Sequence, residues 1–137
     1  MKHLFLDTNV LLDFILQRDG FGPAARQLFV AAEAGEVVLY AAALSFSHIY
    51  YTLRKTNPPA ERLLVLPNLA ASINIIPLTR AVMEAALALG FADFEDGLQY
   101  CAARTAPAIE AIVTRDPRGF AAGTLPVHSP AEALRLL

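Results

Sequence analysis

The sequence has one cysteine, no tryptophan and no long apolar run. Cys101 alone cannot form an internal disulfide, and its Tyr-Cys-Ala-Ala setting in a helical pattern favours core packing. The richest apolar stretch, residues 37–44, is strand-sized and far short of the roughly 18 residues that a membrane-spanning helix needs. The N-terminal residues show no secretory signal pattern, so we expect a cytoplasmic protein without a membrane association.

Basic charge is also scarce. The formal net charge is −2, so the whole molecule does not have the basic character of many nucleic-acid binders, and any such binding must be local. The sequence offers no glycine-rich phosphate loop, no nucleotide fingerprint and no nucleophilic serine or cysteine constellation. The D-x-D pattern of haloacid-dehalogenase-like phosphatases is missing as well, because residue 9 is asparagine.

What the sequence has is an alternation of short apolar runs with helical periods over 137 residues, the length of a single domain (1–137). Strands are expected at 3–6, 37–42, 73–78, 111–114 and 125–128. Helices are expected at 9–18, 24–34, 45–55, 59–72, 79–90, 93–105 and from 129 onwards. Continuously apolar strands separated by helices predict an α/β fold, a three-layer α/β/α sandwich with a central, mainly parallel sheet.

Acidic residues stand at the predicted ends of these elements. Asp7 follows the first strand, Asp116 follows the fourth, and Asp93 and Asp96 share the first turn of one helix. Sites in parallel sheets lie beyond the carboxyl ends of the strands, so these carboxylates are expected to share one pocket. Clustered carboxylates stay ionised together mainly around a divalent cation, and an all-oxygen set suits Mg²⁺ or Mn²⁺ better than zinc.

Each acidic residue also has a simpler interpretation. Asp7 and Asp93 could serve only as helix caps, with Asp96 completing a capping box. Asp116 precedes a proline and could be an ordinary turn residue, whereas Glu95 points away from Asp96 on a helix and is expected to be solvated. Asp13, one turn beyond Asn9, is expected at the surface or behind the site.

Four motifs follow one another along the chain: LDTNVLLD (6–13), DFEDGLQYCAA (93–103), VTRDPRGF (113–120) and PVHSPAEAL (126–134). In order and spacing they resemble the PIN-domain family, metal-dependent ribonucleases that include the VapC-type toxins. The resemblance implies that Asp7, Asp96 and Asp116 are catalytic metal ligands for Mg²⁺ or Mn²⁺. It implies that Asp93 is a nearby catalytic carboxylate, and that Thr8, Asn9 and Thr114 orient the ligands by hydrogen bonds.

One position departs from the family pattern. Most members carry an acidic residue on the helix after the second strand, where SFSHIYYTLRK (45–55) places His48. Histidine can ligate Mn²⁺ but is a poor ligand for Mg²⁺, so metal affinity should fall and activity is in doubt. The alternative is a half-buried histidine that is bonded to a carboxylate or to the backbone.

These features leave two functions open. The first is a ribonuclease that hydrolyses RNA phosphodiesters, including the option of a type II toxin with an antitoxin partner. The second is a catalytically weakened module that acts by binding RNA or protein. Arg115 or Arg118 could neutralise charge on the phosphate. The tyrosines and basic residues of 50–55 are candidates for RNA contact, namely Tyr50, Tyr51, Arg54 and Lys55.

A homodimer is the further expectation, since many resembling proteins dimerise and 55% of the residues are hydrophobic. The predicted helix 59–72 carries leucines that could form the interface, although core packing explains them equally well. They are Leu63, Leu64, Leu66 and Leu69.

Overall fold

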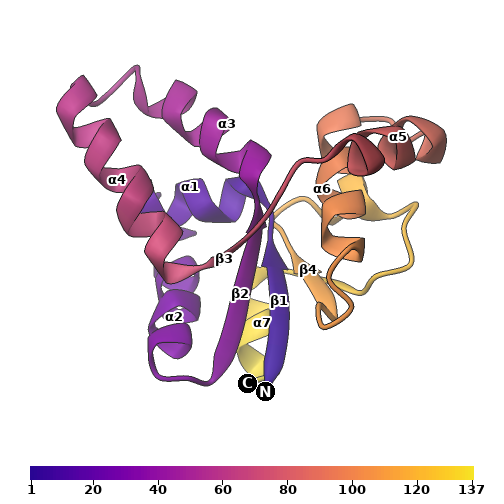
Figure 1. Cartoon of the computed structure of the whole chain (residues 1–137). Coiled ribbons are helices and arrows are strands. Elements are labelled where there is room, and N and C mark those ends of the chain that lie inside the picture. The colour runs from indigo at the N-terminus through magenta and orange to yellow at the C-terminus, as the bar shows by residue number, and fades with distance from the viewer.

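The computed structural model describes all 137 residues, and a five-stranded sheet runs through its centre (Figure 1). The strands are β1 (Lys2–Leu6), β2 (Val37–Ala42), β3 (Asn74–Ile76), β4 (Ala111–Val113) and β5 (Val127–His128). Their order is β3-β2-β1-β4-β5, and every neighbouring pair is parallel. The predicted α/β/α fold is therefore confirmed, and the sheet is wholly parallel.

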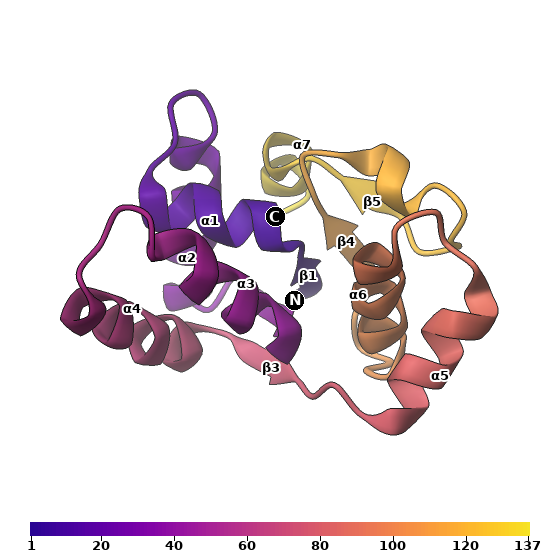
Figure 2. The same ribbon diagram turned by 90° about the horizontal axis from the view of Figure 1, so that it is seen from above.

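Helices cover both faces of the sheet, as the view from above shows (Figure 2). One face carries α1 (Thr8–Leu16), α2 (Gly22–Glu33), α3 (Ala43–Leu53), α4 (Pro59–Ser72) and α7 (Pro130–Arg135). The other carries α5 (Arg80–Leu89) and α6 (Phe94–Arg104). A first hydrophobic cluster fills the space between the sheet and the five helices of the first face, and a second lies between the sheet and α5 and α6. In β1, Leu4 and Leu6 belong to the first cluster and Phe5 belongs to the second. The central strand is buried on both faces, which explains its continuously apolar sequence.

The predicted helix starts agree with the structure where a side chain caps the helix. The Thr79 hydroxyl accepts a hydrogen bond from the Val82 amide at 3.2 Å, and Ser129 with Glu132 forms a complete capping box. Gly90 ends α5 with φ of 70°, the left-handed conformation in which glycine is favoured. Cys101 packs in the second hydrophobic cluster, as expected.

Other boundaries were predicted wrongly. A helix was expected to begin at Ser45, but α3 begins at Ala43 and Ser45 lies buried inside it. The third strand stops at Ile76, because Pro77 has no amide hydrogen to continue the ladder. A short 3₁₀ helix, η1 (Pro117–Phe120), follows β4 and was not foreseen.

The leucines of α4, the longest helix, were considered for a dimer interface, and they differ in their exposure to solvent. Leu69 is buried in the core and Leu66 is half-buried, whereas Leu63 and Leu64 are exposed. Core packing therefore accounts for part of this set. No helix in the structure has both the length and the apolar character to span a membrane.

A buried carboxylate ties the first helix to the segment after β4. Asp13 is fully buried, although the sequence suggested a surface or supporting position. The Arg115 Nη2 atom donates a hydrogen bond to Asp13 Oδ1 at 3.1 Å, and Arg115 Nε forms an ion pair with Asp13 Oδ2 at 2.6 Å. Arg18 Nη1 reaches Asp13 Oδ1 at 3.4 Å. Asp13 therefore holds two arginines from loops that flank the carboxyl edge of the sheet.

We predict that Asp13→Asn lowers the free energy of unfolding by about 2 kcal/mol, because it weakens charge-assisted bonds to partly exposed arginines. Urea denaturation of both proteins measures the difference. Asp19→Asn, an exposed change in the turn after α1, serves as the control and should leave the midpoint unchanged. An Asp13→Asn midpoint equal to that of the control would show that the pair contributes nothing.

Candidate active site

The carboxyl ends of β1 and β4 meet at one edge of the sheet. The chain builds β2 and β3 on one side of β1 and then crosses to build β4 on the other side, which makes this edge a topological switch point. The Asp7 amide donates a hydrogen bond to the Val113 carbonyl at 2.9 Å and so continues the ladder beyond β1. Residues that follow the two strands therefore lie next to each other.

Asp7 is both a helix cap and part of the pocket at this edge. Its Oδ1 accepts a hydrogen bond from the Thr8 amide at 2.6 Å, and its Oδ2 accepts one from the Thr114 hydroxyl at 2.7 Å. Only 7% of the residue is exposed. Burial raises the pKa of Asp7, hydrogen bonds from Thr114, Gln99 and Thr8 oppose that rise, and the charge of Glu95 adds to it. The capping role and the site role are thus compatible.

Thr114 lies at the centre of a hydrogen-bond network behind the pocket. Its hydroxyl oxygen accepts bonds from Asn9 Nδ2 at 3.4 Å and from the Asp116 amide at 3.0 Å, while donating to Asp7. The side-chain oxygen Oδ1 of Asn9 accepts a bond from the Arg115 amide at 3.4 Å. This network fixes the start of the loop that carries Asp116, so one threonine links the ends of two strands.

The first turn of α6 supplies three more carboxylates. Asp93 caps the helix by accepting a bond from the Asp96 amide at 3.0 Å, while the Asp96 side chain lines the pocket with Asp7 and Asp116. Burial raises the pKa of Asp96 to about 7, with further contributions from the charges of Asp93, Asp7, Glu95 and Asp116. Without a cation, the neighbouring carboxylates therefore oppose the ionisation of Asp96.

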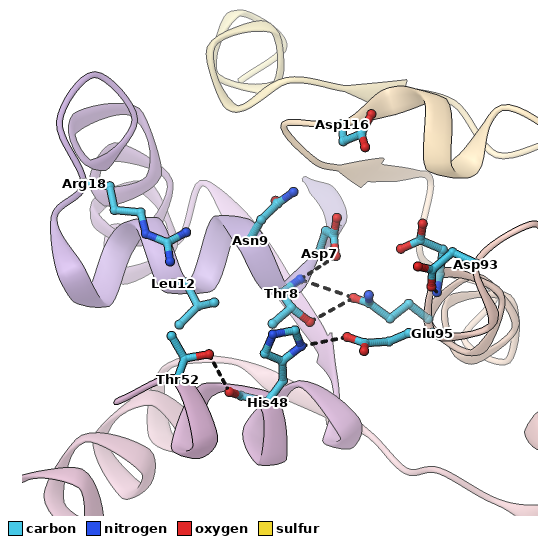
Figure 3. Close-up of a pocket in the computed structure, with 12 residues that line it drawn as sticks. Asp7, Thr8, Asn9, Leu12, Arg18, His48, Thr52, Asp93, Glu95 and Asp116 are labelled. Atoms are coloured by element: carbon cyan, nitrogen blue, oxygen red, sulfur yellow. Dashed lines mark hydrogen bonds and ion pairs between the residues drawn. The ribbon is translucent and has the colours of Figure 1, made fainter. Parts of the chain in front are cut away.

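Glu95 is the acidic residue whose place in the pocket was not predicted, although 40% of its side chain is exposed to solvent. It was expected to be solvated, but its side chain lines the pocket and its Oε1 lies 2.9 Å from His48 Nδ1 (Figure 3). His48 is thus bonded to a carboxylate, one of the two interpretations that the sequence left open, although it is exposed at the rim. The sequence did contain a signal for this contact, because it places a histidine on one helix and several acidic residues in the first turn of another helix at the same edge of the sheet.

The pocket encloses about 430 Å³, and Leu12 is the one hydrophobic residue among those that line it. Sequence reasoning missed Arg18, Thr52 and Gln99, which also line it. Arg115 does not line the pocket, since its guanidinium is bonded to Asp13 and stacked on Phe21 at 4.0 Å.

The remaining candidates for substrate contact lie at the margin of the pocket. Arg118 is exposed beside Asp116, and Tyr51 lines an adjoining hollow that it shares with His48 and Glu95. Arg54 stacks on the Tyr51 ring at 4.1 Å, whereas Tyr50 lies under Arg62. Tyr51 is therefore the better placed of the two tyrosines for contact with a bound molecule.

The donor set fits a hard divalent cation, with one qualification on geometry. Five carboxylates and no thiolate line the cavity, which is the chemistry that Mg²⁺ and Mn²⁺ select. No three acidic or histidine side chains converge closely enough to hold a bare ion by themselves. Mg²⁺ in proteins keeps several waters and uses one or two carboxylates directly, so a hydrated cation fits this cavity.

The fold and pocket together define an α/β/α protein with an acidic cavity at the switch point of a parallel sheet. The family model described as PIN domain matches residues 3–118, and the chain belongs to the PIN-domain family. The resemblance inferred from the four motifs is thus confirmed. PIN domains are in general nucleases that use divalent metals, so membership supports a hydrolase of this class. Comparison with curated proteins gave no match.

Solved structures with the same fold include toxins of toxin–antitoxin systems. A toxin–antitoxin complex from Klebsiella pneumoniae is 21% identical, with a TM-score of 0.69 over 93% of this chain and 97% of that chain. VapC20 from Mycobacterium tuberculosis, described as a toxin that cleaves the sarcin-ricin loop, is 17% identical with a TM-score of 0.69 over 89% and 96%. FitAcB from Neisseria gonorrhoeae is 18% identical with a TM-score of 0.67 over 93% and 98%. At these identities the likeness shows the fold.

The raised pKa of Asp96 gives a test in the metal-free protein. The folded state disfavours the ionised carboxylate, so this group's contribution to stability is present below pH 4 and is lost as the pH rises toward 7. We predict that Asp96→Asn has a higher Tm than the wild type at pH 8 in EDTA, and that the difference vanishes near pH 4. Thermal scans across this range measure it. The control Glu84→Gln removes an exposed carboxylate outside the pocket, and an equal pH effect in that variant would contradict the assignment to Asp96.

Proposed function

We propose that the protein is a metal-dependent endoribonuclease that hydrolyses phosphodiester bonds of RNA. The observation that carries this proposal is the gathering of Asp7, Asp93, Glu95, Asp96 and Asp116 around one open cavity. Membership of the PIN-domain family supports the nuclease class. Such a cluster is unfavourable on its own, as the raised pKa of Asp96 indicates, and a bound divalent cation would remove the repulsion.

Asp7, Asp96 and Asp116 would hold the Mg²⁺ or Mn²⁺ ion, with Asp93 and Glu95 adding negative charge close by. The ion, when bound, supplies a Lewis acid for the phosphoryl oxygen and lowers the pKa of water toward neutrality. Thr114 keeps Asp7 oriented through the 2.7 Å hydrogen bond, and its contact with the Asp116 amide sets the start of the Asp116 loop. The carboxylates are therefore positioned before substrate arrives.

The His48–Glu95 pair favours a catalytic site over a weakened binding module. His48 stands where most family members carry an acidic residue, and this would remove one negative charge from the cavity. Glu95 brings a carboxylate to the same place from the opposite wall, and His48 Nδ1 holds it at 2.9 Å. The chain therefore retains a carboxylate in this part of the pocket, although it comes from α6 in place of α3.

A role as the toxin of a type II module is the more specific form of the proposal. The similar toxin–antitoxin complex from Klebsiella pneumoniae supports an antitoxin partner for this chain. A toxin of this kind would act on RNA in the cytoplasm. A homodimer is supported by apolar side chains that remain exposed on α4 and α5, namely Leu63, Leu64, Met83, Leu87 and Leu89. Light scattering that shows only monomer at tens of micromolar would contradict the dimer.

Cleavage of RNA tests the proposal directly. The wild type should cut single-stranded or loop RNA in Mg²⁺ or Mn²⁺, and EDTA should abolish the activity. Asp7→Asn should lower the rate at least a hundredfold, about 2.7 kcal/mol of barrier, because it removes a ligand charge without changing shape. Asp19→Asn is the matched control outside the pocket and should retain activity. Undiminished cleavage in EDTA would refute metal dependence, and a wild type that binds RNA without cutting it would favour the module.

A second pair of variants tests the role of Glu95. Glu95→Gln should raise the Mg²⁺ concentration that gives half-maximal cleavage by roughly tenfold, because an anionic oxygen beside the ion is lost. His48→Gln keeps a hydrogen-bonding group next to Glu95 and should have a smaller effect. The opposite result would be that His48→Gln abolishes Mn²⁺-supported cleavage while Glu95→Gln leaves cleavage unchanged. In that case the histidine is a metal ligand and Glu95 is only its hydrogen-bond partner.

A further inference from the structure

The acidic cavity must also accept an anion if its substrate is RNA. Each phosphate of RNA carries a negative charge, so carboxylates without a cationic partner would repel it. Arg18 is the one arginine or lysine that lines the cavity. Figure 3 shows it on the α1 side of the cavity, across from Asp93 and Glu95.

The charge balance around Asp13 leaves Arg18 available. Asp13 makes its two short contacts with Arg115, at 2.6 and 3.1 Å, which is enough to compensate one buried carboxylate. The single contact from Arg18 is longer, at 3.4 Å, and one-third of the Arg18 side chain is exposed. Asp13, Arg115 and Arg18 together carry a net charge of +1. Arg18 has the weaker contact with Asp13, and it is the arginine that lines the cavity.

The backbone around Arg18 is fixed by local hydrogen bonds. Its carbonyl accepts bonds from the amides of Phe21 at 3.1 Å and Gly22 at 2.7 Å, and its own amide donates to the Asp13 carbonyl at 3.2 Å. The Phe21 ring in the same turn packs under the Arg115 guanidinium at 4.0 Å. The turn that presents Arg18 is therefore anchored to α1 and to the segment after β4, so little backbone freedom of this turn remains to be lost on binding.

We propose that Arg18 binds a phosphate group of the RNA strand that occupies the cavity, and that Asp13 is the positioning residue that aims it. This inference rests on the proposed ribonuclease function and adds the residue that recognises the backbone of the substrate. An arginine suits this role because its planar guanidinium can give two parallel hydrogen bonds to phosphate oxygens. Arg115, in contrast, is committed to Asp13 and Phe21 and serves the fold.

Equilibrium binding of a fluorescently labelled single-stranded RNA tests the proposal. The parent is the full chain with Asp96→Asn, which should not cut the RNA, in Mg²⁺ at several salt concentrations. Adding Arg18→Ala should raise the Kd on the order of tenfold. It should also reduce the slope of log K against log salt by about 0.7, the value for one phosphate contact with a single strand. Adding Arg18→Lys should keep most of the slope while binding more weakly than the parent, because the charge stays and the paired geometry is lost.

Arg26→Ala, in the same parent, is the matched control, since it removes an exposed arginine of α2 that lines a different hollow. Its Kd and salt slope should equal those of the parent. A purely structural Arg18 would lower the Tm in Arg18→Ala and leave the salt slope unchanged, and that result would overturn the proposal. An equal loss of slope in Arg26→Ala would also overturn it, because the effect would then be one of net charge.

Failure of the proposed function would look different. If the wild type cuts no RNA and the parent binds none, both the ribonuclease and the Arg18 proposal fall. If the wild type cuts RNA and Arg18→Ala changes neither Kd nor slope, only the assignment of Arg18 falls.

Discussion

Parallel pairing of β1 with β4 brings together residues that are more than a hundred positions apart in the sequence. Val113 accepts a hydrogen bond from the Asp7 amide, and Thr114 then donates one to the Asp7 carboxylate. Asp116 follows two residues later, with its amide held by the same threonine. A shift of one residue in this register would turn Thr114 to the opposite face and would separate the two carboxylates. The pocket depends on this pairing more than on any single helix.

The second constraint is electrostatic. Desolvation and four neighbouring carboxylates raise the pKa of Asp96 to about 7, so the metal-free cavity is a site of unrelieved repulsion inside an otherwise well-packed protein. Arg115 and Asp13 satisfy each other's charges behind the cavity, and His48 partners Glu95 at its rim. The protein therefore neutralises the charges around the pocket, including Asp116 through its ion pair with Arg118, and leaves Asp7 and Asp96 without a cationic side chain. Such an arrangement is typical of a site that functions with a cation bound.

The sequence predicted the order of the elements because strands buried on both faces are continuously apolar and because caps such as Thr79 and Ser129 mark helix starts. It also predicted that Asp7, Asp93, Asp96 and Asp116 would share an edge, since the carboxyl ends of parallel strands converge. It failed where tertiary contacts decide the outcome. Glu95 was assigned to solvent from helical geometry alone, and its side chain is 40% exposed, but it also contacts His48 on the facing helix and lines the pocket. Arg115 was considered for the phosphate, because the sequence left open whether Asp13 lies at the surface or behind the site and gave no sign that the two residues pair.

The central claim is that the clustered carboxylates form a binding site for one divalent cation. Calorimetric titration of Mg²⁺ and Mn²⁺ into the purified full-length chain tests it most directly, with an Asp7→Asn/Asp96→Asn double variant titrated in parallel. We expect saturable binding of one ion to the wild type and its loss in the double variant, while both proteins remain folded. Equal binding of the cation by the two proteins would contradict the account.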